Sequence, residues 1–377
     1  FSEIGSDLVT NGDFSAAGSN LVSNPNFTDG VEKIVDGDFP LPNVNWTLNS
    51  GWTIPVGGSA DWATLGSNNP ITQSLTFATD KSYKVTFTIA NVVGTTVRIL
   101  IRNQGDVNQD ITASWEDFDD GTFTYYFVSS SNNTSINIYG RDDVGDSFSL
   151  SNVSVKELGA DWTVSGTDAS HSVEFIETGA RYQSGTTSPT LLLYQDALVV
   201  GKNYVLNVNI AYTSGLLRLG SGIPSTDLVE GLNTLYFVAS GVSASFLRGG
   251  TNVDCIISNI SVQELGEGWT LGTGWSIGED KAISTLQSGS QYLTQSSIIE
   301  SGKSYKVTFQ IIDYTSGSVK ATVSGDEGTA RTGIGTYTEI LNATGTNFSI
   351  KNQSGAFIGS ITNISVKEIA TSYLTQA

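Results

Sequence analysis

The sequence contains one pattern three times, and this repetition limits the fold more than any other feature. The block DKSYKVTFTI at residues 80–89 returns as GKNYVLNVNI at 201–210 and as GKSYKVTFQI at 302–311. A second block closes each copy and ends at Leu158, Leu265 and Ile369, which are spaced 107 and then 104 residues apart. A regular period of this length indicates consecutive copies of one structural unit.

The repeated blocks predict β-strands. In the third copy of the first block, apolar side chains occupy every second position, at Tyr305, Val307, Phe309 and Ile311. Alternation with period two, rich in aromatic and β-branched residues, is typical of a strand with one buried face. No stretch keeps a helical period, and glycine is frequent, with 41 residues. We therefore predict an all-β fold of three tandem antiparallel β-sandwich domains.

The blocks divide the chain into five parts. We expect an N-terminal extended segment at 1–44, three modules at 45–158, 159–265 and 266–369, and a C-terminal tail at 370–377. A module of roughly a hundred residues is long enough to bury one core. Each module opens with a tryptophan, at Trp46, Trp162 and Trp269. Because these tryptophans recur in every copy, we expect them to pack in the cores.

The N-terminal segment carries three short echoes of one motif. They are LVTNGDF at 8–14, LVSNPNF at 21–27 and IVDGDF at 34–39. Each is a short strand followed by a turn and a phenylalanine, and the segment is too short for a core of its own. We expect it to lie on the first module or on a neighbouring subunit, where it would serve assembly or anchoring.

Charge and composition exclude several classes of function. The net charge of −19 is opposite to the basic stripe that nucleic acid requires, and it disfavours an anionic membrane surface. No run of about 18 apolar residues is present, so we expect no membrane insertion. The single cysteine, Cys255, leaves no intrachain disulfide, and its alternating neighbours place it facing a core.

The residues that catalysis needs are scarce. The chain has one histidine, His171, in the polar stretch DASHS, and no other copy has a histidine at that position. No carboxylate pair stands out as the acid and base of a glycosidase. We therefore expect a protein that is not an enzyme.

The order of motifs resembles that of a known family. Asn-Gly-Asp-Phe, Gly-Trp-Thr, Lys-x-Tyr-x-Val-x-Phe and Leu-x-Asn-Val-Ser-Val-Lys-Glu follow one another at residues 11–14, 51–53, 81–87 and 150–157. This order resembles the jelly-roll carbohydrate-binding modules of the four-and-nine type, within the galactose-binding-like superfold. It is similar to the tandem modules of this type in phage tail fibres and virion appendages. The resemblance covers about residues 8–369 and implies three jelly-roll modules with a sugar-binding concave sheet face.

The resemblance also implies a calcium ion, and the sequence departs from the family at that place. Modules of this type often hold calcium near the Asn-Gly-Asp-Phe turn, partly through an aspartate in the closing strand. The closing strands here carry asparagine instead, at Asn152, Asn259 and Asn363. The second and third modules have no Asn-Gly-Asp-Phe turn of their own in sequence, so we do not expect the family's calcium site there.

Two residue classes are candidates for sugar binding. Tryptophans that vary between copies are candidates for stacking on a sugar or a partner, at Trp52, Trp62, Trp115 and Trp275. Basic residues after a turn are candidates for hydrogen bonds to hydroxyl groups, at Arg98, Arg218, Lys320, Arg141 and Arg248. The alternative is a core position for the tryptophans and an ordinary exposed strand face for the basic residues. Gln73, Gln195 and Gln295 cap strand ends or contact ligand, and the sequence leaves both open.

One acidic loop is a candidate cation site. The sequence WEDFDDG places Glu116, Asp117, Asp119 and Asp120 close together, and hard cations such as calcium bind clustered oxygen ligands. The spacing of a calcium-binding loop is absent, so a solvated loop is the alternative. Calcium is the only cofactor that the sequence suggests.

The sequence favours a structural protein of a phage virion. We expect a fibre, spike or decoration protein on the virion surface or otherwise extracellular, which forms homo-oligomers and contacts other virion proteins. Tandem modules add length, and several weak glycan sites on a multimer would give avidity for a cell surface. A secreted bacterial adhesin, or the binding part of a polysaccharide-degrading enzyme, is the alternative. A structural filament or surface-layer subunit without a ligand is the third.

Overall fold

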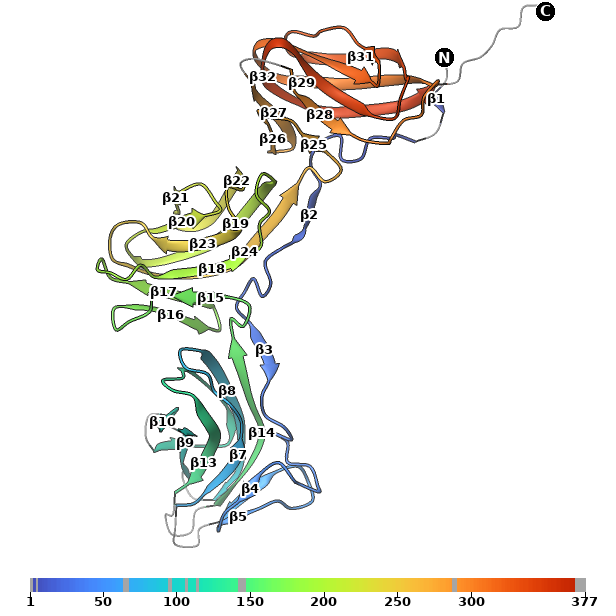
Figure 1. The fold of residues 1–377 in the computed structure, drawn as a ribbon. Helices are drawn as coiled ribbons and strands as arrows, with labels where there is room; N and C mark the ends of the chain where they lie inside the picture. The colour runs from blue at the N-terminus through green and yellow to red at the C-terminus, as the bar shows by residue number, and fades with distance from the viewer. Residues whose placement is uncertain are drawn as a thin grey trace, which may run out of the picture.

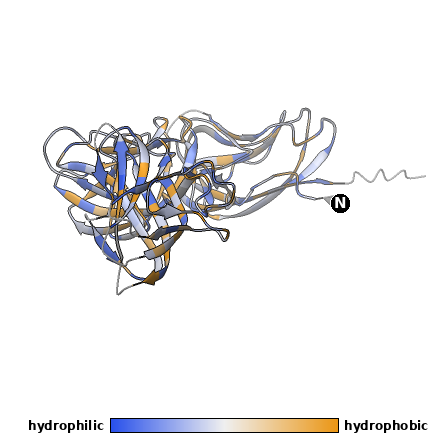
Figure 2. Ribbon diagram, turned by 90° about the horizontal axis from the view of Figure 1, so that it is seen from below, coloured by the Kyte–Doolittle hydropathy of each residue, from blue (hydrophilic) through white to orange (hydrophobic). Residues whose placement is uncertain are grey.

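The all-β prediction is confirmed. The computed structural model describes residues 3–4, 6–63, 68–93, 97–105, 108–112, 115–141, 147–286 and 290–369, and these residues form strands and no helix. Consequently no described part of the chain forms a helix suited to crossing a membrane. Three sandwich modules follow one another along the chain (Figure 1). Apolar and polar residues alternate along their strands, as the sequence pattern requires (Figure 2).

Module 1 is a sandwich of two antiparallel sheets. Its first sheet has the order β10 (Gln109–Asp110), β9 (Val97–Gly105), β13 (Asn133–Gly140), β7 (Pro70–Ser74) and β4 (Thr47–Leu48), with β11 (Glu116–Phe118) on β9. Its second has the order β12 (Gly121–Val128), β8 (Ser82–Val93), β14 (Ser147–Leu158), β6 (Ala60–Ala63) and β5 (Trp52–Thr53). The core between the sheets includes Trp62, Ile101 and Ile138.

Module 2 repeats both sheets. The first has the order β15 (Thr163–Ser165), β18 (Leu192–Asp196), β23 (Ser243–Arg248), β20 (Leu217–Ser221) and β21 (Thr226–Asp227). The second has the order β16 (His171–Ile176), β17 (Gly179–Ser184), β24 (Val253–Leu265), β19 (Asn203–Ser214) and β22 (Gly231–Val238). Cys255 is fully buried in this core, as expected, and burial raises the pKa of its thiol to about 12.

Module 3 joins its two layers through two long strands. β29 (Ser304–Val323) and β32 (Phe348–Ile369) continue from one layer into the other, so the strands form one sheet. The others are β25 (Thr270–Leu271), β26 (Trp275–Gly278), β27 (Lys281–Leu286), β28 (Tyr292–Gln295), β30 (Asp326–Glu327) and β31 (Gly335–Asn342). Irregularities in the pairing of β29 with β32 allow the strands to bend between layers.

The N-terminal segment lies on all three modules of its own chain, in reverse order. β1 (Glu3–Ile4) pairs with β32 of module 3, β2 (Ala17–Asn20) with β24 of module 2, and β3 (Asp29–Glu32) with β14 of module 1. The prediction that it lies on the first module is thus confirmed, among these three strands, for β3 alone, and the segment also extends over modules 2 and 3. We call residues 6–39 the strap, which runs beside the modules in Figure 1.

Each echo in the strap supplies a phenylalanine to one core. Phe14, Phe27 and Phe39 are at most 1% exposed and belong to the cores of modules 3, 2 and 1. Their ring centroids lie 5.4, 5.1 and 5.0 Å from those of Trp269, Trp162 and Trp46, in that order. These tryptophans are 6%, 2% and 5% exposed, which confirms their predicted place in the cores.

The repeated glutamines bind the strap. In module 1, Gln73 accepts a hydrogen bond from the N–H of Val35 at 2.9 Å and donates one to the carbonyl oxygen of the same residue at 2.7 Å. Gln195 binds Ser23 and Gln295 binds Thr10 in the same way. The glutamines therefore recognise backbone, which resolves the alternative that the sequence left open.

The tryptophans bind the strap as well. The indole N–H groups of Trp46, Trp162 and Trp269 donate to the carbonyl oxygens of Asp36, Asn24 and Asn11, at 3.0, 3.1 and 3.2 Å. Each echo thus meets the same groove chemistry: a glutamine amide, an indole N–H and an apolar pocket for its phenylalanine. Modules 2 and 3 therefore do have a turn of the Asn-Gly-Asp-Phe type, supplied by the strap, although their own sequence lacks it.

The turn of each echo holds its phenylalanine in a left-handed conformation. Phe14, Phe27 and Phe39 have φ values of 59°, 56° and 53°. A bulky residue adopts this region at a cost of about 1–2 kcal/mol. Full burial of an aromatic ring in a preformed core offsets this cost.

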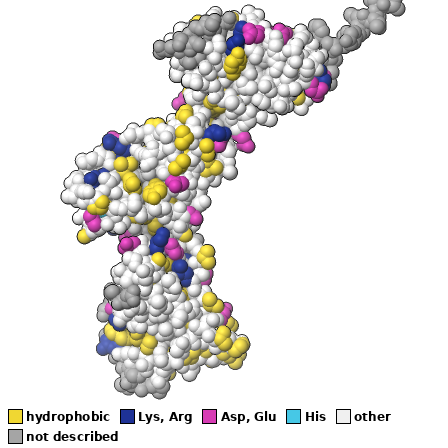
Figure 3. Space-filling view, viewed as in Figure 1, with side chains coloured by type: hydrophobic (Ala, Val, Ile, Leu, Met, Phe, Trp, Pro, Cys, Tyr) yellow, Lys and Arg dark blue, Asp and Glu magenta, His cyan; other side chains and the backbone are white. Residues whose placement is uncertain are grey.

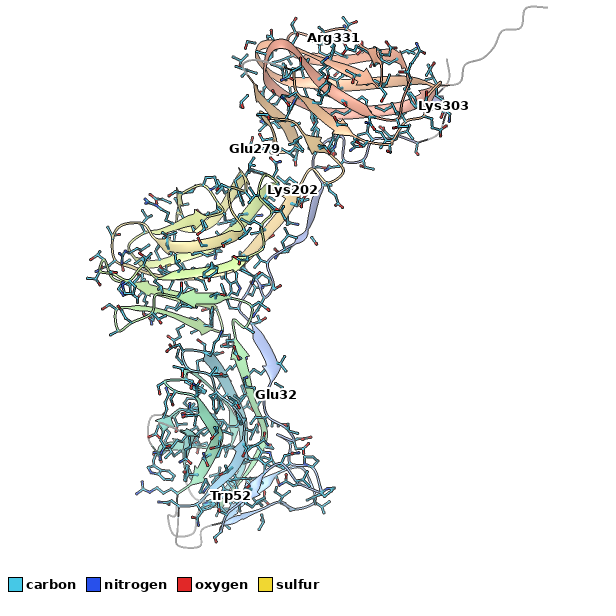
Figure 4. The ribbon with its side chains drawn as sticks, viewed as in Figure 1. Glu32, Trp52, Lys202, Glu279, Lys303 and Arg331 are labelled. Atoms are coloured by element: carbon cyan, nitrogen blue, oxygen red, sulfur yellow. The ribbon has the colours of Figure 1, made fainter. Side chains whose placement is uncertain are left out.

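Neighbouring modules meet at two equivalent joints. The N–H of Phe175 donates to Ser82 Oγ at 3.2 Å between modules 1 and 2, and the N–H of Ile277 donates to Asn203 Oδ1 at 3.0 Å between modules 2 and 3. Lys202 and Glu279 lie on either side of the second joint (Figure 4). The joints and the strap together connect the modules into one consecutive array, which is bent at the joints in Figure 1.

Candidate functional site

The outer face of the first sheet of module 1 combines half-exposed aromatic rings with polar side chains. Alternation along β7, β9 and β13 turns Ile71, Ile101 and Ile138 into the core. The neighbouring residues on these strands face outward. We call this surface the outer face, made of Thr72, Arg102, Gln104 and Tyr139, with Trp115 beside it. Asn137 lies between them on β13 but is only 3% exposed.

Tyr139 is the centre of the outer face. The ring of Trp115 meets it edge-on, with centroids 6.4 Å apart. The guanidinium of Arg102 lies 5.9 Å from its ring centroid, and the amide of Gln104 donates to its hydroxyl at 2.7 Å. The ring is therefore held in one orientation while both aromatic residues stay partly exposed.

The polar groups of the outer face are also held in place. Arg102 Nε donates to Asp110 Oδ1 at 2.5 Å, and this bond is the main cause that raises the pKa of Arg102. The hydroxyl of Thr72 donates to Asn137 Oδ1 at 2.6 Å. Such fixed donors and acceptors lose little conformational freedom when a ligand binds.

This arrangement suits a ligand with both an apolar face and hydroxyl groups. Aromatic rings stack on the C–H faces of such molecules, while amide, hydroxyl and guanidinium groups bind their hydroxyls. Because the guanidinium of Arg102 is bound to Asp110, the face carries little net charge for an ionic ligand.

The equivalent faces of modules 2 and 3 have different chemistry. Register places Leu247 and Lys351 at the position of Tyr139. In module 3, Glu327 accepts hydrogen bonds from Lys320 and Lys351, and Lys351 lies 5.5 Å from the ring centroid of Tyr292. These bonds, first that from Lys320, lower the pKa of Glu327 to about 2.

The lowered pKa of Glu327 predicts an acid-dependent loss of stability in module 3. A carboxyl whose folded pKa is depressed contributes stability above its unfolded pKa of about 4.3, and this is lost as pH falls through the folded value. Its side chain is 44% exposed, so we expect a loss of at most about 1 kcal/mol. Chemical denaturation at pH 5 and pH 2.5 should show this component in the wild type and not in Glu327→Gln. A carboxyl that titrates near 4.3 by NMR would contradict it.

Three of the four tryptophans expected at a sugar face lie in cores. Trp52, Trp62 and Trp275 are 4%, 1% and 5% exposed. The rings of Trp52 and Trp62 pack 5.3 Å apart, and that of Trp275 packs 6.2 Å from Phe357. The expectation that they lie on an exposed face was therefore wrong. Their burial follows from strands β5, β6 and β26, which turn them between the sheets.

The predicted basic residues do not form one site. Register places Leu100 at the position of Arg218 and Lys320, and the side chain of Arg98 lies outside the described residues. Arg218 pairs with Asp227 at 2.5 Å, and Lys320, only 7% exposed, pairs with Glu327. The remaining two residues, Arg141 and Arg248, follow or end a strand of the first sheets and are half-buried.

Arg248 and His171 fix a loop of module 2. Arg248 donates to the carbonyl oxygens of Gly185 and Thr187. His171, 1% exposed, bonds Asp168 Oδ1 through Nδ1 at 2.6 Å and the Thr187 carbonyl through Nε2 at 3.1 Å. The neighbouring joint between modules 1 and 2 contains a cleft of about 460 Å³, yet the polar groups of this network are already bonded to one another. These bonds give the histidine and the arginine structural roles.

The structure does not bring the four acidic residues of the predicted cation site together. β11 directs Glu116 toward Tyr125, and Phe118 beside it is buried in the core. Asp120 accepts from the N–H of Val92 at 3.0 Å, and Asp117 and Asp119 are exposed. Within the described ranges, no three acidic, histidine or cysteine residues are placed to hold a metal ion. Burial and the bond to Glu116 raise the pKa of Tyr125.

The residues that make up the outer face were mostly missed from the sequence. The stretch NTSINIYG at 133–140 alternates, with Ile136 and Ile138 inward. Since alternate residues of a strand face opposite sides, Asn137 and Tyr139 must face outward, and the sequence alone could have predicted this. The contact of Tyr139 with Trp115 was not predictable, because it depends on the pairing of β11 with β9, which no local pattern in the sequence indicates.

Comparisons with known proteins give distant structural likenesses only. No protein-family model matches the sequence, and no curated protein matches it. The tandem CBM22 domains of Xyn10C from Paenibacillus barcinonensis align at 11% identity with a TM-score of 0.26, covering 66% of this chain and 99% of that one. The M60 catalytic domain with two CBM51 domains of ZmpB from Clostridium perfringens aligns at 9% identity with a TM-score of 0.19, covering 83% and 34%.

A cyclase from Fischerella sp. TAU also aligns, at 14% identity with a TM-score of 0.20, covering 37% of this chain and 96% of that one. These likenesses are too distant to carry an argument about function. The case for a function rests on the geometry of the outer face.

Proposed function

We propose that this chain is a non-catalytic glycan-binding protein and that the outer face of module 1 is its sugar site. The observation that carries the proposal is the half-exposed pair Tyr139 and Trp115, set among fixed polar groups. The ligand class is a neutral saccharide, which offers C–H faces for stacking and hydroxyls for hydrogen bonds. The tandem array would present this weak site at a distance from its attachment, and copies in an assembly would add avidity.

We further propose that the protein is a structural part of a virion appendage, a fibre, spike or decoration, exposed on the particle or otherwise extracellular. The support is the resemblance of the motif order to modules of phage appendages, together with the strapped array of modules. Charged side chains are only scattered over the face seen in Figure 3, as suits an exposed particle surface. Detection of the protein in purified particles tests this, and its recovery with a secreted catalytic domain would favour a polysaccharide-degrading system.

The test of the sugar site is a glycan array probed with the intact chain, with and without calcium. Binding to a neutral sugar class is the expected result. We expect Tyr139→Ala to weaken that binding about tenfold to thirtyfold, because central aromatic contacts contribute most of the energy at such sites. Trp115→Ala should act in the same direction.

Tyr292→Ala is the matched control, because Tyr292 is a 43% exposed tyrosine on the equivalent face of module 3. It should leave binding at module 1 unchanged. Equal loss in both variants, or no loss in Tyr139→Ala, would remove the outer face of module 1 as the site. Thermal melts confirm that each variant is folded.

A further inference from the structure

We propose that the strap groove of module 3 is an exchangeable site whose ligand is residues 6–14, the arm, of a second copy of this chain. The arm contains the first echo, and its groove is built from residues of module 3. Reciprocal exchange of arms would join two copies at module 3 in a symmetric pair. This interaction goes beyond glycan binding and does not depend on it.

Within the described part of the chain, the hydrogen bonds between the arm and a module all go to module 3. The N–H of Leu8 donates to the Val366 carbonyl at 2.9 Å, and the N–H of Val366 donates to Asp7 Oδ1 at 2.9 Å. The N–H of Ile364 donates to the Gly12 carbonyl at 2.9 Å. Two of these bonds join backbone groups and the third uses the Asp7 carboxylate, and none of them requires a covalent link between the arm and module 3.

The groove also fixes where the arm binds. Gln295 bonds both backbone groups of Thr10, Trp269 donates to the carbonyl of Asn11, and Phe14 is buried beside Trp269. Between the arm and these partners the chain separation exceeds 250 residues. The arm therefore behaves toward module 3 as a peptide ligand that happens to be tethered. An identical arm from a second copy satisfies the same bonds.

The segment after the arm suits a hinge. Ser15, Ala16 and Ala17 are exposed and small, and Gly18 follows them. The next pairing, of β2 with β24, joins only Ala17 to Leu265 and Asn20 to Gln263, with an irregular register between. Exchange of an identical element through an exposed hinge is a low-cost route to a dimer. Because the arm is tethered to its own module 3, its effective concentration at that groove is high. The arm of a second copy competes better as the protein concentration rises, so the fraction of exchanged arms must rise with it.

The experiment mixes two full-length preparations. Both preparations carry a protease sequence in place of residues 15–16. The donor also carries Ser6→Cys, labelled with a fluorophore, and the acceptor is unlabelled and carries an affinity tag. Cys255 is fully buried with a pKa raised to about 12, so only the new cysteine reacts. After incubation the tagged copy is purified, and both hinges are then cut on the column.

Exchange predicts that label is retained with the tagged copy before and after the cut, in an amount that rises with concentration. Phe14→Ala in the donor should lower this amount at least about tenfold, because the arm loses its buried anchor. Melting curves of the uncut donor show that it is folded. Exchange also predicts that the body of the donor is released by the cut, because the crossed arms were its only link to the tagged copy. A donor body that stays on the column with its label would mean a dimer without exchange, and label that never copurifies would mean an arm fixed in its own chain. Either result overturns the proposal.

Discussion

Replacing Phe27 with alanine is expected to lower the free energy of unfolding of module 2 by about 3–5 kcal/mol. Phe27 lies outside module 2 in sequence, in the strap, yet it is fully buried in that core. Its ring lies 5.1 Å from Trp162 and 5.2 Å from Phe175. Alanine would leave a cavity between the two rings, and alanine would keep the left-handed backbone at residue 27.

The measurement is denaturant unfolding combined with hydrogen exchange, which reports on each module separately. We expect protection to fall in β19 and β24 of module 2 and to change little in β8 and β14 of module 1. Val31→Ala is the matched control, because Val31 is another apolar strap residue but is 85% exposed. It should change stability by less than about 0.5 kcal/mol. A loss of stability of similar size in both variants would contradict this prediction, because Phe27 would then contribute no more to stability than an exposed residue of the strap.

The strap shows where sequence reasoning stops. Alternation predicted the strands, and the repeats predicted three modules, because both signals are local or periodic. The echoes also predicted strand, turn and phenylalanine. They could not predict a destination, because the three grooves bind them mainly through backbone groups and an aromatic pocket that all modules share. Antiparallel pairing with the last strand of each module then determines the reversed order.

The tryptophan error has a different cause. Variation between copies suggested exposure, but the variation reflects different ways to fill one volume. Val173 pairs with Tyr182 in module 2, where Trp275 pairs with Ser284 in module 3. A large residue on one strand is matched by a small one on its neighbour, so the total volume is similar. A comparison of the copies one position at a time does not detect this compensation, because the compensating residue lies on another strand.

Module 1 fills the same place in a third way. Trp52 pairs with Trp62, and both rings need room. That room comes from glycine: a Cβ on Gly140 would lie 2.5 Å from the indole of Trp62. The equivalent positions in modules 2 and 3 are Arg248 and Asn352, which could not accommodate a second tryptophan there. Core filling thus explains residues that sequence variation had assigned to ligand binding.

Trp275 tests this account of the core. We expect Trp275→Ala to lower the stability of module 3 by about 3–5 kcal/mol, because Ser284 opposite cannot fill the cavity. Trp275→Phe should cost much less, because the buried indole N–H of Trp275 has no hydrogen-bond partner among the described residues. Denaturant unfolding of both variants provides the measurement.

Trp269→Phe is the informative comparison. The indole N–H of Trp269 donates to the Asn11 carbonyl at 3.2 Å, and the N–H of Phe14 donates to the same oxygen, so phenylalanine there removes one of two hydrogen bonds to this carbonyl of the strap. We expect this variant to be less stable than Trp275→Phe by about 1 kcal/mol and to lose protection in the arm. If Trp275→Ala instead melted like the wild type, Trp275 would not be part of the core. If the two phenylalanine variants were equal, the tryptophan bond would not help to hold the strap.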